Sequence, residues 1–137
     1  MKLPLTGGCA CGAIRYEITA EPSFLFNCHC RDCQRLSGSA FVPVVYLPKS
    51  GFRWTKGTIR HHFTESARGG QHKRGFCAEC GSRISGGESD QGIGVTASSL
   101  DDASFFRPQV NIWVSDACAW VTLEPELPAF PEYPPQG

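Results

Sequence analysis

The sequence predicts a mainly β protein made of small antiparallel sheets. Short apolar segments recur along the 137 residues, and the 15 glycines and 10 prolines between them are typical of turns that connect strands. No amphipathic run is long enough for a substantial helix. With 41% hydrophobic and 19% charged residues, the chain has the composition of a folded protein. Its length predicts a single domain over residues 1–137.

The expected strands follow one another along the chain. Residues 13–19 alternate between apolar and polar side chains, as in a half-buried strand. Residues 31–36 form the short helix that we expect. Because proline cannot donate a hydrogen bond to a sheet, Pro43 places its own strand at an edge or a bulge. The other expected strands are residues 24–27, 41–47, 58–63, 93–97 and 110–114.

The chain from about residue 127 onward is rich in proline and is expected to be extended. A polyproline-like segment forms no internal hydrogen bonds, so its contacts with the rest of the protein come from other groups. We expect this tail to lie across the domain through Phe130 and Tyr133.

The net charge is zero, but the charges are distributed unequally. Residues 1–83 carry 12 basic and five acidic side chains, whereas residues 84–137 carry one basic and eight acidic side chains. The zero net charge and the lack of a basic tail argue against a nucleic-acid partner. The apolar runs are too short to cross a bilayer, and residues 1–6 lack the apolar segment of a signal peptide. We therefore expect a cytoplasmic protein without a membrane partner.

Seven of the eight cysteines fall into groups with the spacing of metal ligands. In a reducing compartment, such clustered thiols more often hold metal than form disulfides. Cys77 and Cys80 are spaced as in a zinc knuckle, and a second pair of thiols occurs at Cys9 and Cys11. A glycine follows each pair and permits a tight turn. Together the four thiolates would complete a closed tetrahedral site, whose role is structural.

The third group, Cys28, Cys30 and Cys33, leaves a tetrahedral metal one ligand short. An open coordination position distinguishes catalytic zinc from structural zinc. His29 is a possible fourth ligand, but in an extended chain its side chain points away from those of its neighbours. Cys118 is another possible fourth ligand, although a lone cysteine is more often simply buried. The spacing leaves open whether this group is catalytic or a second structural site.

The cysteines belong to longer motifs at residues 8–12, 27–39 and 74–82, and further matching segments follow at residues 100–102, 107–113 and 127–131 and at Trp120. In these motifs the sequence resembles the glutathione-dependent formaldehyde-activating enzyme family, whose domain also occurs in centromere protein V. The resemblance covers nearly the whole chain. It implies a β-tent fold, in which small antiparallel sheets surround zinc.

The resemblance further implies a carbon–sulfur lyase that condenses glutathione, or a similar thiol, with formaldehyde or a small aldehyde to an S-hydroxymethyl adduct. The chain departs from the family at Asn111, where many members have histidine, and at Cys118, where an apolar residue is common. Because asparagine cannot transfer a proton as histidine does, the alternative is a non-catalytic, zinc-stabilised binding module. Two zinc ions are implied, a structural one held by Cys9, Cys11, Cys77 and Cys80 and a catalytic one held by Cys28, Cys30 and Cys33.

Glutathione is an anion, because its two carboxylates outweigh its one ammonium group. The basic stretch of residues 49–74 is therefore expected to bind it, although each of these side chains has the alternative of an ordinary exposed charge. Asp32, inside the third cysteine group, is either a general base or a cap for the turn after Cys30. The candidate carboxylate partners are Arg53, Lys56, Arg60, Lys73 and Arg74.

Overall fold

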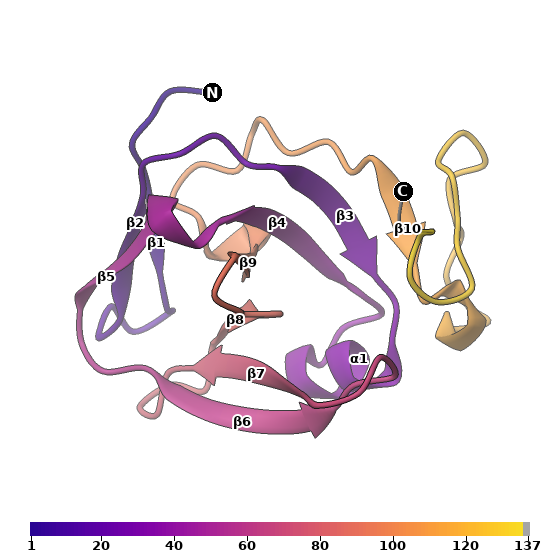
Figure 1. Cartoon of the computed structure of the whole chain (residues 1–137), viewed down its shortest axis with the longest axis horizontal. Helices are drawn as coiled ribbons and strands as arrows, with labels where there is room; N and C mark the ends of the chain where they lie inside the picture. Colours follow the sequence, from indigo (N-terminus) through magenta and orange to yellow (C-terminus); the bar gives the residue numbers. More distant parts are fainter. Residues whose placement is uncertain (136–137) are drawn as a thin grey trace.

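The structure of the protein, a computed structural model, describes residues 1–135, and its strands form two sheets (Figure 1). A three-stranded sheet has the order β1-β2-β5, and a seven-stranded sheet has the order β10-β3-β4-β9-β8-β7-β6. The fold is mainly β as predicted, but one sheet is large and mixed, because β10 runs parallel to β3. The strands are β1 (Leu5–Gly8), β2 (Arg15–Ile18), β3 (Phe24–Cys28), β4 (Val42–Pro48), β5 (Phe52–Lys56), β6 (Arg60–Glu65), β7 (Gln71–Phe76), β8 (Arg83–Gly86), β9 (Gly92–Thr96) and β10 (Val110–Ile112).

Helical structure is short. The helix α1 (Arg31–Ser37) confirms the helix expected over residues 31–36, and it ends at Gly38, whose φ of 70° suits a residue without a β-carbon. Three 3-10 turns complete the elements, namely η1 (Lys49–Gly51), η2 (Ala97–Ser99) and η3 (Val114–Asp116). Within residues 1–135, no helix has both the length and the apolar character needed to cross a membrane.

The six expected strands coincide with β2, β3, β4, β6, β9 and β10, although their ends differ by a few residues. The expected edge position of Pro43 is wrong, because β4 lies between β3 and β9 inside the larger sheet. Pairing of β4 with β9 begins only at Val44, so β9 does not need the N–H that Pro43 lacks. Four strands, β1, β5, β7 and β8, were not expected from the sequence, because they are short, polar or rich in glycine.

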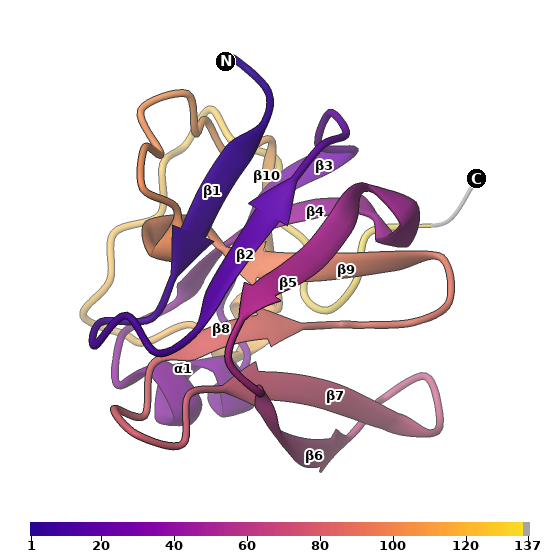
Figure 2. The same ribbon diagram turned by 90° about the vertical axis from the view of Figure 1, so that its left-hand side faces the viewer.

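The main core lies between the two sheets, which pack against each other in Figure 2. Tyr16 and Ile18 of β2 are buried against the larger sheet, which contributes Val45 and Leu47 of β4. Because side chains alternate across a strand, the neighbouring residues of β4 point to the opposite face of the sheet. That second face is not part of the main core, and it carries the candidate site.

The proline-rich tail lies along β10, as its extended character predicts. Backbone hydrogen bonds join Asn111 to the tail at Pro128 and Phe130, and Phe130 packs on a smaller core beside α1. Tyr133 reaches further, and its hydroxyl lies 2.8 Å from Nε2 of His72 on β7. The tail is therefore held at both of the aromatic residues expected to anchor it, while residues 136–137 lie outside the described part of the chain.

Candidate functional site

The two cysteine pairs come together in one cluster, although 65 residues or more separate them in the sequence. Cys9 and Cys11 lie in the turn between β1 and β2, and Cys77 and Cys80 lie in the turn between β7 and β8. All four Sγ atoms lie within 4.8 Å of one another. The Sγ of Cys11 is 3.6 Å from that of Cys9 and 3.8 Å from that of Cys77. Sulfurs of a tetrahedral zinc site are about 3.8 Å apart, so the cluster fits one such ion.

The surroundings of this cluster favour thiolates, the form in which cysteine binds metal. The N–H of Ile14 donates to Cys9 Sγ over 3.2 Å. Hydrogen bonds from the Ser82 side chain and backbone lower the pKa of the Cys80 thiol to about 5. The glycines that follow the two pairs, Gly12 and Gly81, have φ values of 83° and 78°, which confirms the tight turns expected there.

The third group surrounds the beginning of α1. Cys28 ends β3, Cys33 lies in α1, and Cys30 caps the helix by accepting a hydrogen bond from the Cys33 N–H over 3.3 Å. The sulfur of Cys30 therefore caps the helix. Capping was one of the two roles that the sequence suggested for Asp32, but Asp32 lies in the first helical turn. The three Sγ atoms lie within 4.8 Å of one another, and no further Cys, His, Asp or Glu of residues 1–135 joins them.

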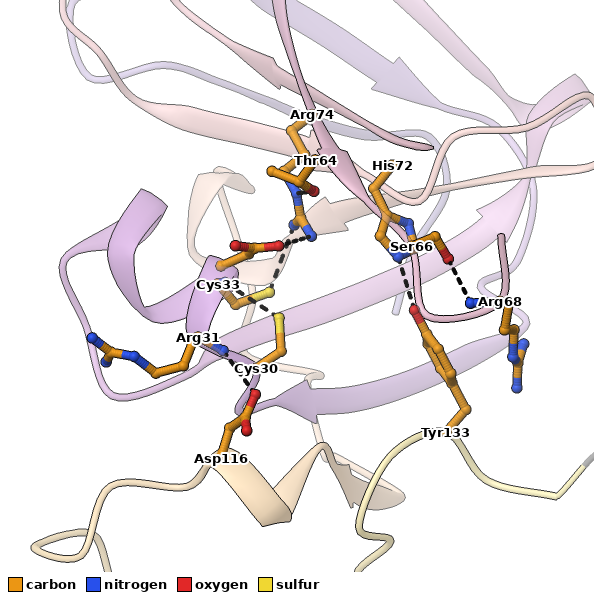
Figure 3. A network of polar contacts seen from close by, with 11 residues as sticks. Cys30, Arg31, Cys33, Thr64, Ser66, Arg68, His72, Arg74, Asp116 and Tyr133 are labelled. Carbon is orange, nitrogen blue, oxygen red and sulfur yellow. Dashed lines mark hydrogen bonds and ion pairs between the residues drawn. The ribbon is translucent and has the colours of Figure 1, made fainter. Parts of the chain in front are cut away.

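An arginine side chain, that of Arg74, points toward the sulfur of Cys33 (Figure 3). Arg74 of β7 is buried, and its Nη1 lies 3.8 Å from Cys33 Sγ while its Nη2 lies 3.8 Å from the Asp32 carboxylate. Hydrogen bonds from Cys28 and Cys30 lower the pKa of Cys33, with a further contribution from Arg83. The same sulfur contacts raise the pKa of Cys28. Of the three sulfurs, that of Cys33 is the one that the Arg74 guanidinium faces.

The two side chains considered as fourth ligands lie elsewhere. His29 is buried, and its Nε2 is 2.9 Å from Oδ1 of Asn111, so it points away from the cysteines as the alternation of an extended chain predicts. Cys118 Sγ lies 3.4 Å from Oε1 of Gln34. Asn111 pairs with Asn27 on β3 and does not line the cavity described below. The side chain at position 111 therefore belongs to the packing between β3 and β10, and not to the cavity wall.

A cavity of about 590 Å³ opens beside the third cysteine group. Its walls include all three of these cysteines, the second face of β3 and β4, and Tyr133 from the tail. Arg68 lies over the ring of Tyr133, 3.9 Å from its centre, and so joins the loop between β6 and β7 to the tail. Four arginines line the cavity, namely Arg31, Arg68, Arg74 and Arg83.

Of the five basic residues expected to bind an anion, Arg74 alone lines this cavity within the described part of the chain. Arg53 and Lys56 belong to the three-stranded sheet, where Arg53 forms an ion pair with Glu17 at 3.0 Å. Arg60 is exposed on β6, and Lys73 Nζ lies 3.9 Å from Glu88.

The sequence analysis did not select the other three arginines of the cavity. Arg31 lies directly beside the third cysteine group, and Arg83 follows the zinc-knuckle pair by three positions, so proximity to the cysteines pointed to both. Arg68 lies in a polar loop next to two glycines and has no comparable sequence feature.

The protein is thus mainly β and has two clusters of thiols that could each hold a metal ion, a group of four and a group of three that faces a cavity. The chain belongs to the glutathione-dependent formaldehyde-activating enzyme family, whose model matches residues 4–116. This confirms the resemblance seen in the cysteine motifs. The fold is also similar to that of a Rhodobacter sphaeroides protein of known crystal structure, with a TM-score of 0.55 and 22% identity, over 70% of this chain and 87% of that one.

Proposed function

We propose that this protein is a carbon–sulfur lyase that joins a glutathione-like thiol to formaldehyde or another aldehyde and catalyses the reverse cleavage. The three-cysteine group carries the proposal, because it lies in the wall of a cavity and no fourth Cys, His, Asp or Glu of residues 1–135 joins it. An incoming ligand therefore has a position to occupy. The family to which the chain belongs supports the same class of reaction.

We assign zinc to both clusters, because sets of thiolates at tetrahedral spacing suit this ion. In this assignment Cys9, Cys11, Cys77 and Cys80 hold a structural ion, and Cys28, Cys30 and Cys33 hold the catalytic one. Zinc at the open site would supply a coordination position that stabilises a thiol in its thiolate form.

The residues of the chain then have distinct tasks. In the reaction the carbonyl π bond opens, a carbon–sulfur bond forms, and the thiol proton passes to the carbonyl oxygen, with no change of oxidation state. Arg74 and Arg83 place positive charge beside Cys33, and Nε and Nη1 of Arg83 are buried without a hydrogen-bond partner in the described part of the chain. These free donors suit a group of thiolates with excess negative charge.

Asp32 lines the cavity and is the carboxylate that we assign to proton transfer.

The first prediction concerns metal content. The purified protein is expected to carry two zinc ions per chain, of which one is lost at low chelator concentration. The reason is that three protein ligands hold an ion less firmly than four, and the open site is reached through the cavity. Native mass spectrometry across a chelator titration measures both ions. A single zinc at every chelator concentration, or iron in place of zinc, contradicts the assignment.

The second prediction concerns the thiol. Arg68→Ala should weaken the binding of glutathione to the zinc-loaded protein about fivefold, because an exposed charge pair contributes up to about 1 kcal/mol. The effect should decrease as salt is added, since both charges face solvent. Arg53→Ala is the matched control, because Arg53 is an exposed arginine outside the cavity. Calorimetric titration of both variants tests this. Equal weakening in the two variants would show that glutathione makes no specific contact with Arg68.

A further inference from the structure

The second face of the larger sheet forms an apolar floor that leads away from the cysteines. Every second residue of β3, namely Cys28, Phe26 and Phe24, lines the cavity. Opposite them on β4, Val44 pairs with Phe26 and Tyr46 pairs with Phe24, and both also line the cavity. Since a strand rises about 3.4 Å per residue, the backbone at Phe24 lies about 14 Å from that at Cys28. The floor thus has a sulfur end and an aromatic end.

Glycines on the neighbouring strands make room for the side chains that border this floor. Gly94 of β9 pairs with Tyr46, and Gly86 of β8 pairs with Gly94. A β-carbon added at Gly94 would come within 2.9 Å of Val44 Cγ1, so a side chain here would intrude on the floor. Both glycines line the cavity. Val44 borders the floor at Gly94, and the Arg83 guanidinium lies over Gly86, where a β-carbon would come within 2.8 Å of Arg83 Nη2. The open part of the floor is therefore the part formed by β3 and β4, between Cys28 and Phe24.

The cavity is large for formaldehyde. Its volume of about 590 Å³ is within the range of about 300–1,000 Å³ that is usual for sites of drug-sized ligands. Formaldehyde is not much larger than water, which occupies about 30 Å³. Glutathione bound here would fill part of the remainder, and the arginines of the wall, rather than the apolar floor, offer partners for its charged groups.

The aromatic side chains of the floor are incompletely covered. Phe24 and Phe26 are half-buried, and their rings lie 5.3 Å apart. Phe24 belongs to neither of the two core clusters, so its ring contributes to no buried core of the described chain. An apolar group placed on these rings would leave water together with them, which is favourable.

We propose that the aldehyde used by this site carries an apolar substituent, such as a medium-length alkyl chain, which lies on the floor between Cys28 and Phe24. The inference rests on the proposed function and names the class of its aldehyde substrate. The carbonyl carbon takes the sulfur end, where it forms the carbon–sulfur bond as its oxygen takes the thiol proton. The apolar substituent lies on Phe24 and Phe26 at the other end of the floor.

Two stable thioethers test the inference by binding alone. S-methylglutathione represents the small adduct, and S-octylglutathione represents the adduct of an apolar aldehyde without its hydroxyl group. The octyl compound should bind the zinc-loaded protein at least about tenfold more tightly, since each methylene that is fully buried contributes a factor of about four. Isothermal titration calorimetry measures both affinities, and this comparison needs no variant of the protein.

A pair of variants then locates the octyl chain. Phe24→Gln should remove most of the preference for S-octylglutathione and leave the affinity for S-methylglutathione unchanged. Phe63→Gln, which replaces a half-exposed phenylalanine of β6 outside the cavity, should change neither affinity. Equal binding of both thioethers by the unmodified protein overturns the apolar aldehyde but leaves the proposed function standing. Failure of both to bind overturns glutathione as the thiol, and with it this inference. A preference that Phe24→Gln leaves intact places the octyl chain elsewhere and also overturns the inference.

Discussion

Replacing Cys80 with serine should leave the protein unable to fold stably. Cys80 is exposed, so the substitution removes almost no packing. It does remove one of four thiols that join the turn between β1 and β2 to the turn between β7 and β8. The binding free energy of a structural zinc ion is comparable with the whole folding stability of a domain. Loss of this ion should therefore abolish the cooperative thermal transition.

The measurement is a thermal melt followed by circular dichroism, together with the zinc content of the soluble protein. Cys118→Ser is the matched control, because Cys118 is a partly buried cysteine that belongs to neither cluster. It should melt within a few degrees of the unmodified protein, since serine can keep the hydrogen bond that the Cys118 thiol donates to Oε1 of Gln34. If Cys80→Ser also melts as the unmodified protein does, the four-cysteine cluster does not stabilise the fold.

Cys33→Ser should have the opposite effect: the protein should still fold but no longer catalyse the reaction. Cys33 lies in α1 and does not belong to the four-cysteine cluster, and serine in its place has the same shape and is only slightly smaller. The helix keeps its cap, because Cys30 Sγ accepts from the backbone N–H of residue 33, which the substitution does not change. The open site, however, loses the thiolate that Arg74 faces, and two cysteines hold zinc weakly.

The expected result is a cooperative melt close to that of the unmodified protein, one zinc ion per chain, and an exchange rate equal to the uncatalysed rate. Exchange nuclear magnetic resonance of glutathione, formaldehyde and their hydroxymethyl adduct measures the rate. If Cys33→Ser unfolds as Cys80→Ser should, the three-cysteine group is structural, and the binding-module alternative is favoured. Full exchange activity in this variant would show that the open site is not the catalyst.

Much of the fold could be predicted because the decisive patterns are local. The strand β2 alternates between buried and partly exposed residues, and β9 is buried along most of its length and contains Ile93, Val95 and Thr96. Both patterns are visible in four to seven residues. The strand β7 escaped prediction because Gln71–Phe76 is polar along most of its length. Its place in the sheet comes from pairing with β6 and β8, which no local pattern reveals. The position of Pro43 inside the sheet has the same origin, since it depends on where β9 begins to pair.

The sequence by itself determined which cysteines belong together in pairs and triplets, because thiols two or three positions apart reach one ion whatever the rest of the chain does. It did not determine which basic side chains face those thiols. Arg53 and Arg74 occur in the same basic stretch, yet Arg53 lies on the three-stranded sheet and Arg74 lies beside Cys33. The difference arises from long-range strand pairing, which turns one residue toward the cavity and carries the other to a separate sheet. The tertiary structure alone likewise decided that Phe24 and Cys28 share one face of a cavity, because the curved sheet, α1 and the tail must all be in place before that face encloses any space.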